Sequence, residues 1–204
     1  MSTTACRRSR STRTTDLDGP PAPVVGPRAD LPATIVTARL ELVSLRVADA
    51  DEMVDVLADP TLYRFIGGGP PTRAELVARY RAQVAGRSGD GREEWRNWIV
   101  RERSGGAATG FVQATITGGD ENRIADVAWV IGVGWQGRGY ATEAAVALVG
   151  WLAAAGIREI VAHVHPDHAA SAAVARRIGL EPTDTLVDGE RRWRREVADL
   201  AAGS

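Results

Sequence analysis

The chain changes from a strand-like to a helix-like pattern across one glycine-rich stretch, Trp129-Val130-Ile131-Gly132-Val133-Gly134-Trp135-Gln136-Gly137-Arg138-Gly139-Tyr140-Ala141-Thr142-Glu143. When a strand leads through glycines into a helix, free backbone N–H groups and the positive end of the helix dipole point to one place. Such a place binds phosphate groups, and Gly137 and Gly139 let the main chain approach an anion closely. Arg138 adds a positive charge with bidentate reach. We therefore expect a phosphate-binding loop at 136–142, the alternative being an ordinary strand-to-helix turn.

Residues 132–137 also match the dinucleotide-binding pattern G-x-G-x-x-G. A Rossmann domain builds further parallel strands after this motif, whereas here one helix and a hairpin follow His165. The segments before the motif are joined by links that are too short for parallel crossovers. We therefore do not expect this loop to bind a dinucleotide.

Three strand-like segments lead up to the loop, at Trp95–Glu102, Thr109–Thr117 and Arg123–Ile131. Their links are short and rich in glycine, which is typical of antiparallel neighbours. The sequence therefore predicts an antiparallel sheet that ends in the glycine loop.

Two helices are expected before these strands. Asp49 with Glu52, and Thr72 with Glu75, each have the spacing of a capping box that opens a helix. An extended run over 38–46 comes before the first of them, and the glycines at 67–69 predict a loop between the two.

Beyond the loop, the apolar periodicity predicts a helix that ends at Gly156 and a buried strand at 159–164. A further helix is expected from about Asp167 to Ile178. The pair Asp188-Gly189 between two short strands predicts a closing hairpin over 185–197. Strands and helices in this order indicate an α/β chain of the α+β kind.

The composition excludes several classes of protein. A chain of 204 residues with 44% apolar residues suits one domain with a tail. The lone cysteine, Cys6, excludes a disulfide scaffold and cysteine-ligated zinc. All 25 basic residues are arginine, so there is no Walker A lysine and no lysine for Schiff-base chemistry. With a net charge of -1 and no apolar run near the ~20 residues that span a bilayer, we expect a cytoplasmic protein without nucleic-acid or membrane partners.

The first 33 residues differ in character from the rest. They combine arginine, serine, threonine and proline without any apolar periodicity, so we predict a disordered tail over 1–33. Asp16 and Asp18 argue against a transit peptide. The folded domain is expected over 37–200.

Gln136, Gly139 and Ala141 fit the acyl-CoA signature Q-x-x-G-x-G/A, and residues 137–144 read like its variant G-x-G-Y-A-T-E-A. From Thr37 to about Val197 the chain thereby resembles the GNAT superfamily of N-acetyltransferases. Its residues 37–42 and 170–180 are similar to the branch of ribosomal-protein N-terminal alanine acetyltransferases.

The resemblance implies a mixed, mostly antiparallel sheet with a V-shaped split beside the strand 129–133, flanked by helices. Acetyl-CoA would bind there as co-substrate, with its pantetheine arm paired to the strand backbone and its pyrophosphate on the loop amides. The residues expected to bind it are Ile131, Val133, Gln136, Gly137, Arg138, Gly139, Tyr140, Ala141, Thr142 and His168. The amine would enter from the other side, lined by the first two helices and their loop.

Two positions depart from this branch of the family. Its second helix usually starts with an asparagine that contacts pantetheine, and here the residue is His168, whose imidazole can still donate one hydrogen bond. Relatives that use a tyrosine acid carry it where this chain has Ala175. Ser171 is therefore the expected catalytic group for the departing thiolate, the alternative being a serine that simply favours a helix start.

A general base is expected among the carboxylates of the strands. Asp126 is the catalytic candidate on the strand that leads to the loop, while Glu93 and Glu94 begin an earlier strand. Each has the alternative interpretation of an exposed charge at a strand end.

Two other clusters are given structural interpretations. His163, His165 and His168 lie close in sequence, but no glutamate of the H-E-x-x-H kind accompanies them, so no metal is expected. The arginines at 191–195 around Trp193 are interpreted as the solvated edge of the terminal hairpin rather than as a nucleic-acid patch.

The sequence thus predicts transfer of an acetyl group from acetyl-CoA to a primary amine, on a protein N-terminus or a small molecule, by direct attack on the thioester. Two alternatives stay open: acetylation of an antibiotic or polyamine, and an acyl-CoA-binding sensor without catalysis. The expected partners are the amine and, as an assembly left open, a second copy of the chain in a homodimer. The substrate loops near 67–71 and 90–94 carry no chemistry that identifies the acceptor.

Overall fold

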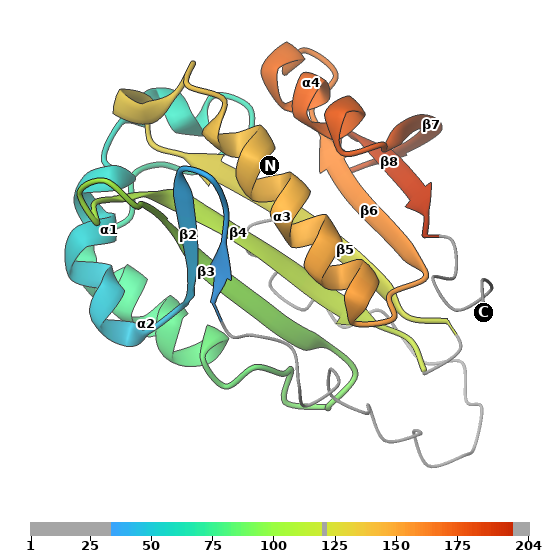
Figure 1. The fold of residues 1–204 in the computed structure, drawn as a ribbon, viewed down its shortest axis with the longest axis horizontal. Coiled ribbons are helices and arrows are strands. Elements are labelled where there is room, and N and C mark those ends of the chain that lie inside the picture. Colours follow the sequence, from blue (N-terminus) through green and yellow to red (C-terminus); the bar gives the residue numbers. More distant parts are fainter. Residues whose placement is uncertain (1–33, 120–121, 198–204) are drawn as a thin grey trace.

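The computed structural model describes residues 34–119 and 122–197 (Figure 1). The tail predicted for 1–33 lies outside the described residues, as do the last positions of the domain predicted over 37–200. Both boundaries therefore stay predictions.

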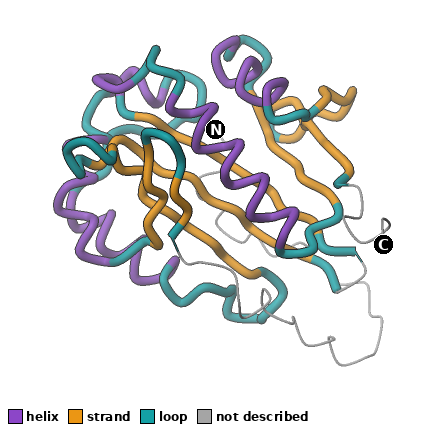
Figure 2. Tube along the Cα trace, viewed as in Figure 1, coloured by secondary structure: helices purple, strands orange, loops and turns teal. Residues whose placement is uncertain are grey.

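The described chain contains both strands and helices, as Figure 2 shows by colour. The strands are β1 Ile35–Val36, β2 Leu40–Ser44, β3 Glu94–Glu102, β4 Ala108–Thr117, β5 Ile124–Ile131, β6 Glu159–Val164, β7 Glu181–Val187 and β8 Glu190–Glu196. The helices are α1 Ala50–Val56, α2 Arg73–Gln83, α3 Tyr140–Ala154 and α4 Ala169–Arg177, with short 3₁₀ turns at η1 Val47–Asp49, η2 Pro60–Tyr63 and η3 Val133–Trp135.

The strands form one mixed sheet in the order β1-β2-β3-β4-β5-β6-β8-β7. The three strands predicted before the glycine loop are confirmed as β3, β4 and β5, and they pair antiparallel as expected. The parallel pair in this sheet is β5 with β6, joined by the crossover helix α3. The predicted mixed, mostly antiparallel sheet flanked by helices is therefore confirmed.

The sheet splits between β5 and β6. The two strands pair at only three positions, with Asp126 opposite Val161 as the last. β5 continues beyond this point to Ile131 paired with β4, while β6 continues to Val164 paired with β8. The two strands therefore diverge, which confirms the V-shaped split that the resemblance implied.

Helices cover both faces of the sheet, and α3 runs across one of them (Figure 1). Ala144, Leu148 and Leu152 repeat every four residues along α3 and are fully buried on the face that this helix shares with α4. On the opposite face, Met53 of α1 and Leu76 of α2 pack in a second core cluster. The sheet thus lies between two well-packed layers of helices.

One predicted capping box is confirmed and the other is wrong. Thr72 accepts the N–H of Glu75, whose carboxylate accepts the N–H of Thr72 in return at 2.7 Å. Asp49 does not cap α1 in this way, because its Oδ2 accepts the N–H of Arg46 at 2.7 Å and its Oδ1 pairs with Arg101. Glu52 likewise binds Arg101 and the N–H of Ala108. A local contact with Arg46, together with contacts from the distant strands β3 and β4, takes the place of the predicted box.

The closing hairpin is confirmed, but its arginines do not lie on the edge of the sheet. β8 lies between β6 and β7, so that β7 forms the edge. Arg192 pairs with Glu159 at 2.9 Å, and Arg195 donates to the carbonyl of Ile178. The interpretation of 191–195 as a solvated edge is therefore wrong, because β8 pairs with β6 on one side and with β7 on the other.

Candidate active site

The glycine loop has the geometry of an anion-binding site. Gly137 and Gly139 have φ values of 75° and 79°, in the region that favours glycine. A Cβ at Gly137 would meet no atom within 4 Å, so open space lies beside the main chain there. α3 begins directly after Gly139 without a side-chain cap, which leaves the first N–H groups of the helix available. These features fit the pyrophosphate of a CoA thioester.

The glycine at the start of the same stretch has a packing role. A Cβ at Gly132 would lie 2.9 Å from both Cγ1 and the carbonyl oxygen of Val56, so this residue allows α1 to approach the sheet. The first glycine of the dinucleotide-like pattern at 132–137 is therefore explained by packing against α1. The strand itself ends at Ile131, so Val133, expected on the strand, belongs to the turn η3 instead.

The backbone of β5 faces the split at the position expected for the pantetheine arm. Gly132 donates its N–H to Thr109 of β4 at 2.8 Å, and along a strand neighbouring N–H groups point to opposite sides. The N–H of Ile131 is therefore directed towards the split. Its carbonyl accepts the side-chain amide of Gln136 at 2.9 Å, so Gln136 braces the turn from within.

Arg138 and Tyr140 lie on a shared carboxylate. The Tyr140 hydroxyl donates to Glu102 Oε1 at 2.5 Å, and Arg138 Nη1 lies 3.4 Å from the same oxygen. The Arg138 side chain is about half exposed at 52% and also donates to the carbonyl of Gly134. Its guanidinium therefore contacts Glu102 and the Gly134 carbonyl and is partly exposed to solvent.

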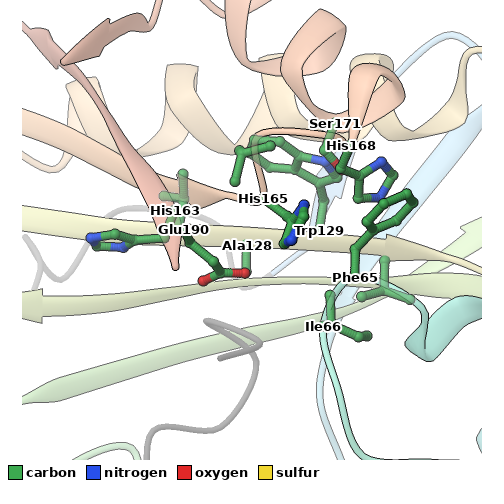
Figure 3. Close-up of a pocket in the computed structure, with 12 residues that line it drawn as sticks. Phe65, Ile66, Ala128, Trp129, His163, His165, His168, Ser171 and Glu190 are labelled. Atoms are coloured by element: carbon green, nitrogen blue, oxygen red, sulfur yellow. The ribbon is translucent and has the colours of Figure 1, made fainter. Parts of the chain in front are cut away.

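A cavity of about 50 Å³ occupies the split (Figure 3), which is room for more than one water molecule. β5 contributes residues 127–130, β6 contributes His163 and Val164, and α4 contributes Ser171. Phe65 and Ile66, from the connection between α1 and α2, close another side. The cavity therefore brings together elements from both halves of the chain.

Ser171 and His168 lie at one end of this cavity. His168 occupies the cap position of α4, and Ser171 is the third residue of the helix. The Phe65 ring stacks on the His168 imidazole with centroids 4.5 Å apart, as Figure 3 shows. Burial, with a smaller effect of His165, lowers the pKa of His168, so its imidazole is neutral at pH 7. The structure therefore places both predicted α4 residues at the cavity.

Glu190, at the start of β8, presents a carboxylate to the same cavity over Ala128 (Figure 3). The residue is 4% exposed, and its Oε2 is buried without a hydrogen-bond partner in the described structure. Burial, and the charges of Asp126 and Asp188, raise the pKa of Glu190 to about 7, while His163 acts in the opposite direction. Glu190 is therefore poised to exchange a proton near neutral pH.

Asp126 lies next to the cavity rather than in its wall. Its Oδ2 is 3.2 Å from Nδ1 of His163, which does line the cavity. The two other acidic candidates, Glu93 and Glu94, lie elsewhere: Glu94 is buried in ion pairs with Arg96 and Arg123. The interpretation of Glu94 as an exposed charge is therefore wrong, and the structure leaves Asp126 as the sequence-predicted carboxylate nearest the split.

The three histidines line the same cavity but have different hydrogen-bonding and stacking partners. His163 pairs with Asp126, His165 accepts the N–H of Asp167, and His168 stacks on Phe65. Among residues 34–119 and 122–197, no group of three His, Cys, Asp or Glu side chains is placed to hold a metal ion. The helices in these ranges include none with the length and apolarity needed to cross a membrane.

Sequence reasoning missed Glu190, Phe65 and Ile66. Glu190 follows the Asp188-Gly189 turn directly, and its only local signal is the alternation that sets Glu190 and Arg192 on the face opposite to Trp193. That alternation identifies a site residue only once β8 is known to pair with β6. Phe65 and Ile66 precede three glycines in a loop, where no periodicity marks them.

A split mixed sheet with an anion-binding loop beside the split is the arrangement predicted above for an acyl-CoA-dependent acyltransferase; the buried carboxylate of Glu190 is an addition to it. Residues 39–181 match the family model described as "Acetyltransferase (GNAT) domain". This match spans more than half of the chain, which therefore belongs to the GNAT acetyltransferase family. A search of curated proteins finds no match.

Solved structures with the same fold include two from the ribosomal-protein branch. RimL, a ribosomal L7/L12 alpha-N-protein acetyltransferase in complex with coenzyme A, aligns with a TM-score of 0.68 at 18% identity, covering 81% of this chain and 99% of that one. An acetyltransferase from Salmonella typhimurium that modifies the N-terminal serine of L7/L12 aligns at 0.66 and 17%, covering 81% and 99%. Both agree with the branch that the sequence resembles.

A third structure is that of an acetyltransferase with a role in self-immunity. The microcin C7 self-immunity acetyltransferase MccE, in complex with acetyl-CoA and AMP, aligns with a TM-score of 0.66 at 15% identity, covering 79% of this chain and 94% of that one. At such identities the likeness shows the fold. The acceptor has to be argued from the site itself.

Proposed function

We propose that the protein transfers the acetyl group of acetyl-CoA to a primary amine, at the cavity between β5 and β6. The observation that carries this proposal is Glu190, a buried carboxylate with an unpartnered oxygen, in the same cavity as Ser171. A proton acceptor at one end and a hydroxyl at the other suit a reaction in which an ammonium is deprotonated and a thiolate leaves.

The donor is held by the loop and the exposed side of β5. Acetyl-CoA, when bound, supplies an acetyl group already activated as a thioester. Gly137, Gly139 and the first N–H groups of α3 would hold the pyrophosphate, and Ile131 would pair with the pantetheine arm. His168 borders the same cavity and can donate one hydrogen bond from its neutral imidazole.

Glu190 takes the role of the general base. Amines of substrates are protonated at pH 7, and an ammonium cannot attack a carbonyl carbon. Glu190 accepts the proton directly or through water in the cavity, and the neutral amine forms the new C–N bond as the C–S bond breaks. His163 lines the same cavity as Glu190, and its Nδ1 lies 3.2 Å from Oδ2 of Asp126.

Ser171 serves the departing sulfur. Its position on the first turn of α4, at the cavity end away from Glu190, suits a hydroxyl that hydrogen-bonds the thiolate of CoA. The products are the acetylated amine and CoA thiol, and the proton taken by Glu190 returns to solvent. A thiolate is a good leaving group, so the contribution of Ser171 is smaller than that of the base.

The acceptor class we favour is a protein N-terminus, because RimL and the Salmonella enzyme are similar to the chain along nearly their whole length. MccE supports small-molecule acceptors as the second candidate. The cytoplasm is the proposed compartment, since one cysteine offers no disulfide framework of the secreted kind. A homodimer stays a prediction.

Release of CoA thiol, measured with and without added amine, tests the proposal. We expect wild-type protein to release thiol from acetyl-CoA only with an acceptor among peptides, polyamines and aminoglycosides, and mass spectrometry to detect the acetylated amine. Binding of acetyl-CoA without release for any amine would support the non-catalytic sensor instead. Absence of acetyl-CoA binding would overturn the proposal altogether.

A further inference from the structure

The residues between β1 and β2 form a strap across the start of α3. Thr37 donates its hydroxyl to Glu143 Oε1 at 2.6 Å, and Arg39 donates its backbone N–H to the same oxygen at 2.9 Å. The Arg39 guanidinium holds the other oxygen, with Nε at 2.7 Å and Nη2 at 2.6 Å. Positions more than a hundred residues apart are thereby joined at the glycine loop.

Arg39 also reaches the loop itself. Its Nη1 donates to the carbonyl of Arg138 at 2.9 Å, and its guanidinium lies over the Tyr140 ring, 4.9 Å from the centroid. In a trans peptide the C=O and the following N–H point in opposite directions. Because the Arg138 carbonyl is turned towards Arg39, the N–H of Gly139 is turned away from it.

The negative charge of Glu143 lies near the expected phosphate site and is bound by Thr37 and Arg39 of the strap. A carboxylate on the first turn of α3 would repel a phosphate group bound at the same helix end. Although partial burial acts to raise it, the hydrogen bonds from Thr37 and Arg39 lower the pKa of Glu143, so it is ionised and paired. Its charge is directed to the strap and compensated there.

We propose that Arg39 is a positioning residue for the CoA pyrophosphate: it sets the peptide that follows Arg138 and neutralises Glu143, so that the loop N–H groups face the anion. This inference rests on the proposed use of acetyl-CoA. It gives a role to the opening motif Thr37-Ala38-Arg39, which the proposed chemistry itself does not use. Arg39 is a positioning residue rather than a catalytic one, because it acts through Gly139 and Glu143.

Arg39→Gln, Arg39→Lys and Arg103→Gln form the test set. Arg103 is a matched control, since its Nη1 binds the same strap at the carbonyls of Thr37 and Ala38 without contacting the loop. Steady-state kinetics are measured with acetyl-CoA and with acetyl-pantetheine, which has no pyrophosphate, and the melting temperature of each variant is recorded.

We expect Arg39→Gln to raise the KM for acetyl-CoA about 10-fold, with kcat and the KM for acetyl-pantetheine nearly unchanged. Arg39→Lys should restore part of the loss, because one ammonium cannot hold Glu143 and the loop carbonyl together. Arg103→Gln should leave both values at the wild-type level.

Three outcomes would overturn the inference. One is an unchanged KM for acetyl-CoA in Arg39→Gln. Another is a rise in KM of Arg39→Gln that is equally large for acetyl-CoA and acetyl-pantetheine, or a rise of the same size in Arg103→Gln. Either result would indicate a general structural role of Arg39. Failure of wild-type protein to bind acetyl-CoA in calorimetry would overturn the proposed function as well, whereas the first two results leave that function intact.

Discussion

Glu190 combines two properties that are rarely found together in a carboxylate of a stable fold: it is 4% exposed, and its Oε2 has no hydrogen-bond partner among the described residues. Burying an ionised carboxylate costs free energy unless it is paired. A protein keeps such a group where its proton affinity is useful, which is the case for a base near neutral pH.

The stability of the protein should therefore depend on the charge of Glu190. Its pKa is raised from 4.5 to about 7 in the folded state, so the native state binds the proton more tightly than the unfolded state. The associated stability is fully present below pH 4.5 and is lost as the pH rises towards 7. We expect Glu190→Gln to exceed the wild type by about 1–3 kcal/mol at pH 8, and the difference to shrink near pH 4.5.

Urea unfolding at both pH values measures this difference. Glu181→Gln on β7 is the control, because that carboxylate is exposed and its removal should change little at either pH. A Glu190→Gln variant less stable than the wild type at pH 8 would mean that the carboxylate is satisfied in the native state, and the base assignment would lose its physical ground.

Ser171 yields a second prediction at the scale of single residues. The cap of α4 is His168, so Ser171 lies in the first turn of the helix and not at the cap, and alanine has a higher helix propensity than serine by about 0.5 kcal/mol. Ser171→Ala should keep or slightly raise the melting temperature. If the hydroxyl assists the departing thiolate, kcat should fall about 10–10³-fold with acetyl-CoA affinity unchanged. An unaltered kcat would assign the leaving-group role to water or to the amine.

At the scale of elements, the turn between β5 and α3 depends on backbone conformation. Gly139 has a φ of 79°, which costs an L-residue about 1–2 kcal/mol, and a Cβ there would lie 3.5 Å from Arg39 Nη2. Gly139→Ala should therefore weaken acetyl-CoA binding about 10-fold or more, since the strained peptide can rotate and withdraw its N–H.

Gly150 provides the matched control within the same helix. It lies in α3, and a Cβ there would meet no atom within 4 Å. Gly150→Ala should stabilise the protein by about 1 kcal/mol and leave the affinity for acetyl-CoA as it was. Calorimetry measures the affinity of both variants for acetyl-CoA. If Gly139→Ala binds acetyl-CoA as tightly as Gly150→Ala does, the conformation of Gly139 has no part in binding the donor.

The elements predicted from the sequence were those governed by local pattern. The Thr72–Glu75 box opens α2 as expected, and α3 has the apolar spacing of a buried helix. The box expected at Asp49 failed because Arg101, 52 residues further along, takes its carboxylate. The position of β8 inside the sheet likewise depends on pairing with β6, which no local pattern encodes.

At the scale of the whole molecule, the cavity is assembled from distant parts of the chain. The donor side, in the loop 136–142, was predicted because its glycines and helix start are contiguous in sequence. The acceptor side was predicted only in part. Glu190 reaches the split because β8 pairs with β6, and Phe65 reaches it from the connection between α1 and α2. Asp126, which was predicted as the base, lies next to the cavity and contacts His163, which lines it.

The pH dependence of kcat/KM, compared between wild type and Glu190→Gln with one amine acceptor, tests the central claim most directly. We predict that the wild-type value rises with pH and levels off above about 7, where Glu190 is ionised. Glu190→Gln should lack this limb and be lower by about 10²–10⁴-fold at pH 7, with acetyl-CoA affinity retained. A variant with the wild-type rate and the same limb would contradict the claim that acetyl transfer in the split between β5 and β6 depends on this carboxylate.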